Sequence, residues 1–515
     1  MADPHNRLKV TEGSARSSDA APATSSALGS TFQWPRERRR TTPTEPPAAI
    51  PAPRRIENVV QGAALIAGVV GALWIYLAPL PAGLSPAGKT GFAVWLLCTT
   101  LWITNFVPFG VTGLLAVALL ALTRAMTPAE AYAAFGSSAV FFLIGIFIIA
   151  GSLIHSGLSK RCALWFLSKF ERSPYAFANG MMLAAAFGTV WMPNQATTAM
   201  LFPIAIEVAL ALRLRPTESN YAKTLFLSLA WGALIGANAS FLGSSRAALA
   251  LGMLQQTYGV GISFSRWMLA GFPVVILGVL VTPLVLRLSF PREDVPFENA
   301  REVLEHEVGK LGKLTRDHWI TLGIVALTIG TWIAVGGRQI DLAVIALLGA
   351  VTLFAAGVLK WENVERHVHW NIVLMYGGAI ALSVLIDKSG AAKWLLDATL
   401  GDAHISPVVA IVGAGVVSLL LSEFMSNAAA VAAVLPLAFT LADRVGASPI
   451  AMCLATSFGA GLDFAFPIST APNTIVFASG YLRTRDFIKA GSIMTIACIL
   501  ILIVVIRYWW PIIGL

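Results

Sequence analysis

The sequence predicts an all-α polytopic membrane protein with about eleven transmembrane helices in two inverted repeats, each containing a re-entrant hairpin and a broken helix. The first observation is composition: 57% of the 515 residues are hydrophobic and 12% are charged, whereas soluble domains carry about 25% charged residues. The second is that continuous apolar runs are long enough to cross a hydrocarbon core of about 30 Å and lack the alternation of barrel strands. The third is a matching pair of polar interruptions.

Two polar passages stand at corresponding places among the apolar runs. They are "MPNQATTAMLFP" at 192–203 and "MSNAAAVAAVLP" at 425–436, and each has an asparagine, Asn194 or Asn427, nine residues before a proline. Irregular backbone at membrane depth persists only where protein or a water-filled cavity satisfies its polar groups. Inverted repeats with broken helices are typical of secondary transporters, whose binding site lies at the repeat interface.

Residues 1–56 are expected to form a disordered cytoplasmic tail. They are rich in Ala, Pro, Ser, Thr and Arg, so they cannot bury enough apolar surface to offset the entropy lost on ordering. Arginines just before the first apolar run predict a cytoplasmic N-terminus. An odd number of spans would then place the C-terminus outside an inner or plasma membrane. The net charge of +9 is attributed to tail and loops, not to nucleic-acid binding.

The first repeat is expected to comprise residues 57–289, with scaffold helices and a hairpin near 175–195. Its apolar runs, in chain order, are 58–80, 91–108, 109–123, 138–157, 175–191, 197–212, 223–256 and 267–289. The run at 223–256 is interrupted by "GANASFLGSSRAA". Residues 159–173 show apolar and basic side chains at helical spacing, which suits a helix lying in the membrane interface.

A hydrophilic stretch of mixed charge at 290–316 is expected to be a cytoplasmic linker. Residues 317–515 then form the second repeat, with scaffold helices and a hairpin near 405–428. Its apolar runs are 318–336, 340–359, 371–387, 405–441, 449–480 and 488–511. The two repeats share further features in the same order, since "LIHSGLSKRCALWFL" (153–167) resembles "LIDKSGAAKWLLDATL" (385–400).

Lysine and arginine residues in loops tend to mark the cytoplasmic side of a membrane. Three stretches that contain several basic residues are therefore expected to be cytoplasmic: 158–173, 287–316 and 360–366. Arg213, Arg215 and Lys223 are expected on the outer side, as exceptions to the rule.

Each interruption offers the groups of a binding site. A helix that stops and restarts leaves free N–H groups at a positive dipole end, which suit an anion, and free carbonyl groups, which suit a sodium ion. A hydroxyl group precedes each passage by one turn, Thr189 before Pro193 and Ser422 before Ser426. The alternative interpretation is a set of proline and glycine kinks held by structural asparagines.

These passages resemble the divalent anion/sodium symporter family, which transports dicarboxylates, citrate or sulfate. The resemblance covers nearly all of 58–511, and "SEFMSNAAAVAAVLPLA" (422–438) and "FPISTAPNTIVFASG" (466–480) are the most similar passages. It implies an elevator-type movement of a transport domain against a homodimeric scaffold in the lipid bilayer. It implies sodium as the bound ion and no other cofactor.

The resemblance also implies roles for residues at the matching positions. Substrate would contact Asn194, Gln195, Ser244, Ser426, Asn427, Ala428 and Thr470. A first sodium ion would bind Thr189, Asn194 and backbone near Pro193 and Gly243, and a second would bind Ser422, Asn427 and backbone near Met425 and Ser469. The hairpin triplets depart from the family's Ser-Asn-Thr pattern, because they are Pro-Asn-Gln at 193–195 and Ser-Asn-Ala at 426–428.

Arg246 replaces the uncharged residues of the family's first broken helix. An arginine inside a membrane is costly and is therefore a functional candidate. We hypothesise that it supplies permanently the positive charge that sodium supplies in relatives, and pairs with an oxygen group of the anion through its planar fork. The alternative is that it snorkels, or pairs structurally with Asp463 or Glu423.

The two acids near the second break have several interpretations. Glu423 could hydrogen-bond loop amides, and Asp463 could carry a proton if transport is proton-linked. The histidines His155, His367, His369 and His404 have no partner at metal-ligand spacing, and the four cysteines form no metal or disulfide pattern.

The leading function is therefore secondary transport of small divalent or polyvalent anions. Symport with a cation and sodium-independent exchange both remain open. The first alternative is an ion or metalloid-oxyanion transporter or antiporter of the same superfamily. An intramembrane enzyme or a sensor is the remote alternative, because the spans contain no nucleophile–base set and the chain has no soluble output domain.

Overall fold

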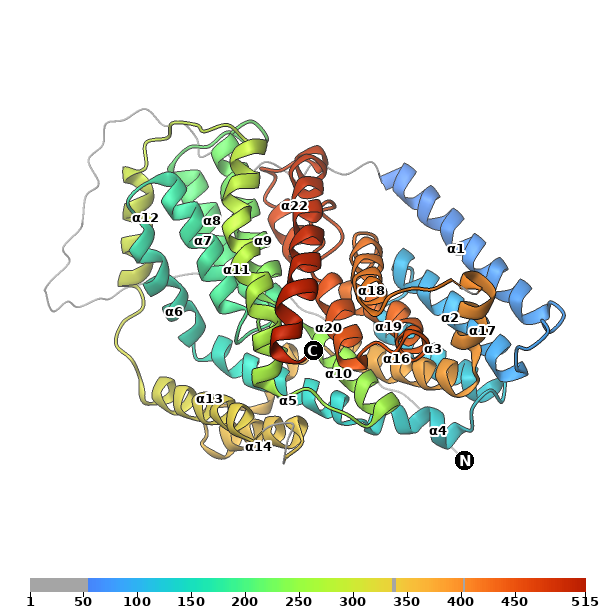
Figure 1. Cartoon of the computed structure of the whole chain (residues 1–515). Coiled ribbons are helices and arrows are strands. Elements are labelled where there is room, and N and C mark those ends of the chain that lie inside the picture. The colour runs from blue at the N-terminus through green and yellow to red at the C-terminus, as the bar shows by residue number, and fades with distance from the viewer. Residues whose placement is uncertain (1–53, 336–339, 402) are drawn as a thin grey trace, which may run out of the picture. The chain divides into compact units, whose positions relative to one another are not determined.

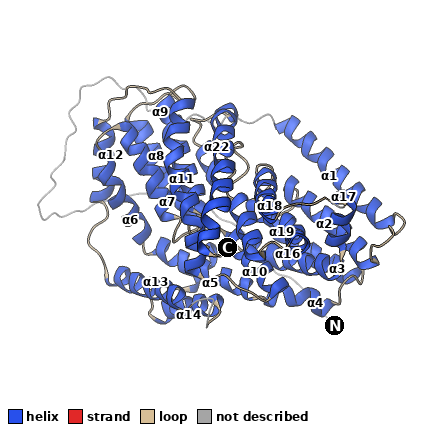
Figure 2. Ribbon diagram, viewed as in Figure 1, coloured by secondary structure: helices blue, strands red, loops and turns tan. Residues whose placement is uncertain are grey.

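The computed structural model describes residues 54–515 apart from 336–339 and 402. The predicted tail lies outside the described residues, except that its last three residues begin the first helix. All regular elements of the described residues are helical (Figures 1 and 2). The predicted all-α fold class is confirmed.

The helices follow the predicted apolar runs closely. The first half contains α1 (Arg54–Leu77), α2 (Pro86–Thr104), α3 (Phe109–Leu122), α4 (Pro128–Ala133), α5 (Ser138–His155), α6 (Leu158–Leu167), α7 (Pro174–Gly188), α8 (Asn194–Ala211), α9 (Asn220–Gly236), α10 (Ser245–Tyr258) and α11 (Phe264–Ser289). Next comes α12 (Glu298–Gly309). The second half contains α13 (Arg316–Ala334), α14 (Leu342–Ala355), α15 (Trp361–Val364), α16 (Trp370–Lys388), α17 (Ala391–Leu400), α18 (Pro407–Ser422), α19 (Asn427–Val445), α20 (Pro449–Gly459), α21 (Ala471–Phe477) and α22 (Thr484–Val504).

Serine residues set the starts of seven of these helices. In each case the Oγ atom accepts a hydrogen bond from the backbone N–H three residues later, which satisfies one free donor of the first turn. The capping residues are Ser85, Ser173, Ser219, Ser263, Ser406, Ser426 and Ser448.

Six helical segments of the described residues are long and apolar enough to cross a membrane. They are Pro128–His155, Phe264–Ser289, Arg316–Ala334, Trp370–Lys388, Asn427–Val445 and Thr484–Ile513. Five shorter apolar helices accompany them. The number of eleven spans stays a prediction, because only six helical segments meet the length criterion and one of them, Asn427–Val445, belongs to a hairpin.

The two halves repeat one order of helices and pack reciprocally. α5 to α11 correspond in order to α16 to α22: a long helix, a short helix, a two-helix hairpin, a broken helix and a long closing helix. α3 packs on α16 of the other half, and α14 packs on α5. In the same way α10 packs against α19 and α20, and α21 against α8 and α9. Each half therefore packs some of its helices against the other half, as two intertwined repeats would. That the repeats are inverted stays a prediction.

Small residues let corresponding helices approach closely in both halves. A Cβ atom on Gly236 of α9 would overlap the backbone of Ala186 in α7. Likewise, a Cβ atom on Gly459 of α20 would overlap the backbone of Gly415 in α18. Small residues at such contacts are typical of membrane helices, where packing replaces the hydrophobic driving force.

The predicted linker contains an ordered helix, α12, which packs against α6 and α8. Lys160 of α6 pairs with Glu307 of α12 at 2.9 Å, and Lys310 also bonds this carboxylate. Hydrogen bonds from Lys160 and then Lys310 hold the pKa of Glu307 well below its ordinary value, at about 2. Arg161 donates to the Gly312 carbonyl oxygen at 3.0 Å. The linker is therefore attached to α6 throughout the physiological pH range.

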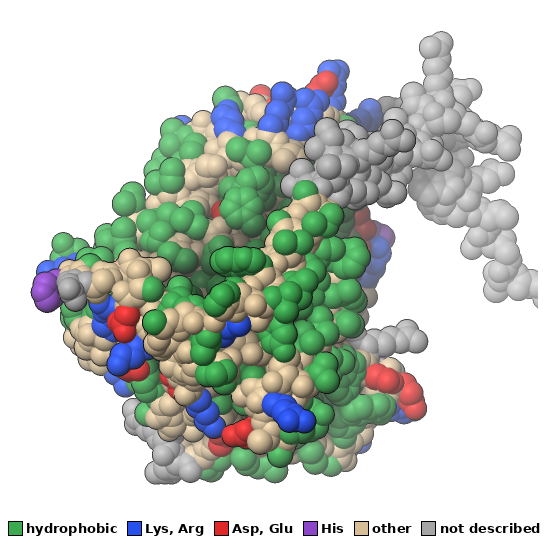
Figure 3. All heavy atoms as spheres, turned by 90° about the vertical axis from the view of Figure 1, so that its right-hand side faces the viewer, with side chains coloured by type: hydrophobic (Ala, Val, Ile, Leu, Met, Phe, Trp, Pro, Cys, Tyr) green, Lys and Arg blue, Asp and Glu red, His purple; other side chains and the backbone are tan. Residues whose placement is uncertain are grey.

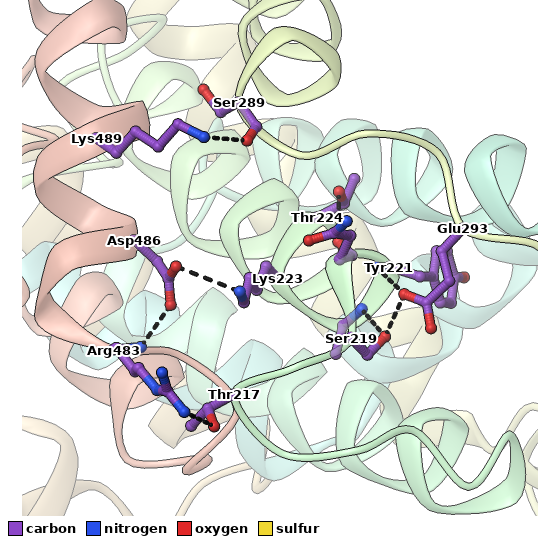
Figure 4. Close-up of polar contacts among 12 residues, drawn as sticks. Thr217, Ser219, Tyr221, Lys223, Thr224, Ser289, Glu293, Arg483, Asp486 and Lys489 are labelled. Carbon is purple, nitrogen blue, oxygen red and sulfur yellow. Dashed lines mark hydrogen bonds and ion pairs between the residues drawn. The ribbon is translucent and has the colours of Figure 1, made fainter.

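A polar cluster joins the starts of α9 and α22 to the end of α11 (Figure 4). The Lys223 Nζ atom lies 3.4 Å from the Asp486 carboxylate, and both side chains are less than one-tenth exposed. Ser219 donates to the Glu293 carboxylate at 2.7 Å, and Lys489 donates to the Ser289 carbonyl oxygen at 2.8 Å. This cluster connects the two halves at the beginning of the linker.

The cluster corrects one expectation about charge. Arg213, Arg215 and Lys223 were expected on the side opposite to the loop 287–316, but Lys223 and the loop before it lie at the same end as Glu293. The expectation was wrong because α7 and α8 form a hairpin whose two ends return to one side.

Apolar side chains cover most of the middle of the side of the molecule where α1, α2 and α17 lie, and charged side chains lie mainly toward its upper and lower ends (Figure 3). Five large apolar residues of α1 are each more than half exposed: Ile66, Val70, Leu73, Trp74 and Leu77. Such a surface suits lipid acyl chains, and the chain is an integral membrane protein.

Candidate anion and cation site

The two asparagine passages form the tips of two helical hairpins. The first tip connects α7 to α8, and the second connects α18 to α19. α8 begins after Pro193, which gives no side-chain cap. Its first two backbone N–H groups donate to the Gly243 carbonyl oxygen and to Asn194 Oδ1. α19 begins after Ser426, whose Oγ atom accepts from the Ala429 amide at 3.3 Å.

Matching hydroxyl groups stand behind the two tips. Thr189 Oγ1 donates to the Ala186 carbonyl oxygen at 2.8 Å, and Ser422 Oγ donates to the Leu419 carbonyl oxygen at 2.8 Å. Both hydroxyl groups are fully buried. The predicted equivalence of the two hairpins therefore extends to side-chain hydrogen bonds.

Each tip is bonded to the broken helix of its own half. In the first half the backbone N–H of Asn194 donates to the Gly243 carbonyl oxygen at 2.9 Å. Ser240 Oγ donates to the Val190 carbonyl oxygen at 2.6 Å. In the second half the Asn427 Nδ2 atom donates to the Asp463 carboxylate at 3.4 Å.

Both tips and both broken helices line one cavity of about 620 Å³. The predicted site residues in its lining are Asn194, Gln195, Ser244, Met425, Ser426, Asn427, Ala428, Ser469 and Thr470. The opposite wall comes from α1, α2, α3 and the start of α16, with Gln61, Trp102, Asn105, Phe109 and His369. Among all the described lining residues, His369 alone has an ionisable side chain. The described lining combines apolar side chains with hydroxyl and amide groups and contains no carboxylate.

Arg246 lies behind this cavity and not in its lining. It is 1% exposed, and it donates to the Ser457 carbonyl oxygen at 2.8 Å, to Ser244 Oγ at 2.7 Å and to Asn238 Oδ1 at 2.8 Å. Within the described part of the chain it forms no ion pair with an acid. Gly461 leaves room for it, because a Cβ atom there would overlap the guanidinium group.

Ser244 connects the buried charge with the cavity. Its Oγ atom accepts from the Arg246 guanidinium group, so the hydroxyl hydrogen must point elsewhere, and Ser244 lines the cavity. A hydroxyl group polarised in this way is a stronger donor to an anion. In this geometry Arg246 acts on the cavity through Ser244 and does not contact it directly.

Glu423 bonds the loop of the second broken helix. Its carboxylate accepts from the amides of Phe464 and Ala465 at 3.0 Å and from Thr495 Oγ1 at 2.8 Å. The side chain is buried and is not part of the cavity lining. These contacts match the structural interpretation of this acid.

The fit of a sodium ion can be tested on buried oxygen atoms that lack a partner. In the second break, Asp463 Oδ2 and Asn473 Oδ1 are buried and have no hydrogen-bond partner among the described residues. Asn473 Nδ2 donates to Ser469 Oγ at 3.3 Å, which directs its oxygen away from the loop. A carboxylate with a second free oxygen donor suits a hard cation.

The first break does not offer such a set. The Asn194 Oδ1 atom accepts from the Gln195 amide at 2.8 Å, and the Gly243 carbonyl oxygen accepts from the Asn194 amide. Thr189 is bonded as described, and Asn238 Oδ1 is bonded to Arg246. Two oxygen atoms of the first predicted sodium site, Asn194 Oδ1 and the Gly243 carbonyl oxygen, therefore already accept hydrogen bonds, and the guanidinium group of Arg246 is bonded to Asn238 beside them.

A second cavity, of about 700 Å³, adjoins the first through Gln195 and His369, which line both. Its walls are α5, α8 and the region of α12, and its ionisable lining residues are Lys160, Glu207, Glu307, His367 and His369. Glu307 of the linker helix α12 is part of its lining. Because this cavity extends from the linker helix to the binding cavity, we call it the access route.

Sequence reasoning missed three residues of this site. Asn238 and Asn473 belong to the broken helices, and their amide groups could have been noticed as polar residues in small-residue breaks. His369 was set aside for lack of a metal partner. The signal that could have identified it is its position at the start of a span whose packing partners line the site.

Comparison with known proteins agrees with this geometry. A family model, the sodium:sulfate symporter transmembrane region, matches residues 60–515. The chain belongs to this family. The resemblance to the divalent anion/sodium symporters is confirmed, so the protein is a secondary anion transporter and not an enzyme.

Two curated relatives and one solved structure illustrate the likeness. The sodium-dependent dicarboxylate transporter SdcS of Staphylococcus aureus (strain USA300) is 27% identical over 478 residues, which cover 87% of this chain and 92% of SdcS. SdcS of strain bovine RF122 / ET3-1 matches to the same extent. The structure of Neisseria gonorrhoeae MtrF is similar in fold, with a TM-score of 0.51 and 14% identity over 88% of this chain and 95% of that one.

Proposed function

We propose that this protein transports small divalent or polyvalent anions, such as C4-dicarboxylates, citrate or sulfate. One observation supports this most: the starts of α8, α10 and α19 meet at a single cavity whose described lining has hydroxyl and amide groups but no carboxylate. Helix N-termini and such donors suit an anion. The description of SdcS as a sodium-dependent dicarboxylate transporter points to the same substrate class.

The coupling cation binds at the second break. Asp463 and Asn473 supply its oxygen donors, together with the predicted set of Ser422, Asn427 and backbone near Met425 and Ser469. When bound, this ion adds positive charge beside the second hairpin tip. At the first break Arg246 supplies that charge permanently through Ser244, so one sodium ion fewer is needed than in a protein with two sites.

Transport follows an elevator-type movement. The binding cavity lies between the hairpins and broken helices on one side and α1, α2, α3 and α16 on the other, which supports two bodies that move against one another. A homodimeric scaffold follows from the family resemblance. A cytoplasmic N-terminus and an outer C-terminus follow from the basic loops, including the loop before Lys223.

Uptake into proteoliposomes tests the proposal. Radiolabelled succinate, sulfate and citrate are offered in parallel, each with and without an inward sodium gradient and with and without internal dicarboxylate. Sodium-driven uptake of any of the three supports symport. Uptake that requires internal dicarboxylate but no sodium supports exchange. Asn194→Ala and Asn427→Ala should each reduce uptake about tenfold or more, because each removes a polar group at a hairpin tip.

Failure of all three anions to enter would contradict the substrate class. The alternative is then an ion or metalloid-oxyanion transporter or antiporter of the same superfamily. Such a transporter would not need Arg246, so an unimpaired Arg246→Gln variant would favour it. A sensor would show saturable binding of an anion without any flux.

A further inference from the structure

His369 stands where the binding cavity meets its access route. It lines both cavities and occupies the N-cap position of α16, without a capping hydrogen bond from its side chain. Its ring meets the Phe147 ring edge-on, with centroids 5.1 Å apart. Among the described residues no hydrogen bond holds this side chain, so a ligand in the cavity can bond it.

His369 differs from the other described residues of the binding cavity because only its side chain can carry a charge. Arg246 reaches the cavity only through Ser244, and the remaining described lining residues are uncharged. The other ionisable groups near the histidine, Lys160, Glu207, Glu307 and His367, line the access route and not the binding cavity. His369 is therefore the one described side chain of the lining that can place a full positive charge against a bound anion.

We infer that His369, when protonated, binds a negatively charged oxygen group of the transported anion, so that the anion binds together with a proton. This inference rests on the proposed function. It names a specificity-determining residue on the wall formed by α16, opposite the hairpin tips. A dicarboxylate fits this arrangement, with one carboxylate at the tips and the second beside the imidazolium group.

The sign of the pH effect follows from linkage. Desolvation, and then the neighbouring His367, lower the pKa of His369 below its ordinary value. A bound anion raises it again, because opposite charge favours the protonated form. Binding therefore takes up a proton, and affinity increases as pH falls from the pKa of the bound state toward that of the free state.

Equilibrium binding to the purified full-length protein tests the inference. Binding of radiolabelled succinate, sulfate and citrate is measured at pH values of about 5.5, 6.5 and 7.5 for wild type and for His369→Gln. The readout is the ratio of the two dissociation constants at each pH, because changes in the charge of the anion itself cancel in this ratio. His404→Gln, in an exposed loop, is the matched control.

We expect His369→Gln to bind about tenfold more weakly than wild type at the lowest pH and nearly equally at the highest, since one unit of pKa shift corresponds to a tenfold change. A ratio that is the same at every pH, whether large or close to one, overturns the inference. His369→Asn gives a second variant if the glutamine variant unfolds. Wild-type protein that binds none of the three anions refutes the proposed function, and this inference falls with it.

Discussion

The two broken helices occupy equivalent places in the chain, yet one places a basic side chain behind the binding cavity and the other an acidic one. The break between α9 and α10 holds Arg246, whose three hydrogen bonds go to neutral acceptors. The break between α20 and α21 holds Asp463, whose second oxygen has no hydrogen-bond partner among the described residues. On the proposed function, the first half needs no added cation, whereas the second half provides oxygen donors for one.

On the proposed function, this difference explains how a site built from two matching hairpins can change its coupling ion while it keeps its fold. Both hairpins keep the buried hydroxyl, the asparagine and the bond to their own broken helix. What differs is the source of positive charge near the anion. Burying a guanidinium group that belongs to the protein costs free energy once, during folding, whereas a bound cation must be taken up in each transport cycle.

The largest effect is expected from Arg246→Gln. This change removes the buried charge and leaves Ser244 without the donor that orients its hydroxyl group. Uptake at low anion concentration should fall about 100-fold, which corresponds to the loss of a buried charge contact. Arg444→Gln, whose guanidinium group pairs with Asp397 near the surface at 3.1 Å, should change uptake less than about twofold. Near-normal uptake by Arg246→Gln would show that the first break needs no charge.

Asp463→Asn should weaken the response to sodium. The variant keeps the shape of the side chain but removes its negative charge, so the sodium concentration for half-maximal uptake should rise about tenfold. At saturating sodium the dependence on anion concentration should change little. Asp397→Asn serves as an exposed control. Sodium dependence that is unaltered in Asp463→Asn would move the cation site elsewhere.

Gly461→Ala tests how tightly the second half encloses Arg246. The added Cβ atom would overlap the guanidinium group, so the protein should lose about 1–3 kcal/mol of stability through overpacking. Gly413→Ala in α18 has no atom within 4 Å of the added Cβ and should gain about 0.5–1 kcal/mol. Thermal unfolding in detergent compares the two. Equal melting temperatures would mean that the guanidinium group moves aside freely.

The smallest effect concerns the hairpin tips themselves. Ser426→Ala removes the cap of α19 and should cost about 1 kcal/mol. Ser448→Ala removes the equivalent cap of α20 and should cost the same. Ser426 lines the cavity, so its variant alone should also require more anion for half-maximal uptake. If Ser448→Ala showed the same transport defect, the higher anion requirement of Ser426→Ala would be explained by lower helix stability and not by a lost contact with the anion.

The order of elements could be predicted because it depends on local composition. Apolar runs, the Asn194 and Asn427 passages and the small-residue breaks each mark a change in backbone without reference to distant residues. The tips and broken helices were accordingly assigned to one site, and the cavity brings them together. α12 could not be predicted, because its stability depends on contacts with α6 and α8 rather than on apolar periodicity.

The contacts of the charged residues could not be predicted for a related reason. Arg246 was expected beside an acid or the anion, but its acceptors are Asn238, Ser244 and a backbone carbonyl of α20. Lys223 was assigned to the wrong side because a hairpin and a full crossing have similar apolar lengths. In both cases the deciding partner is brought close only by the tertiary fold.

The bond from Arg246 to Ser457 spans 211 residues of chain, and this has a consequence for biosynthesis. The ribosome completes α10 well before α20, so the arginine enters the membrane machinery without one of its final acceptors. Its charge must then be accommodated by water or lipid headgroups until the second repeat is inserted. α10 can therefore be fully buried only after the last helices have been made. In truncated chains α10 should be recognised by membrane quality control.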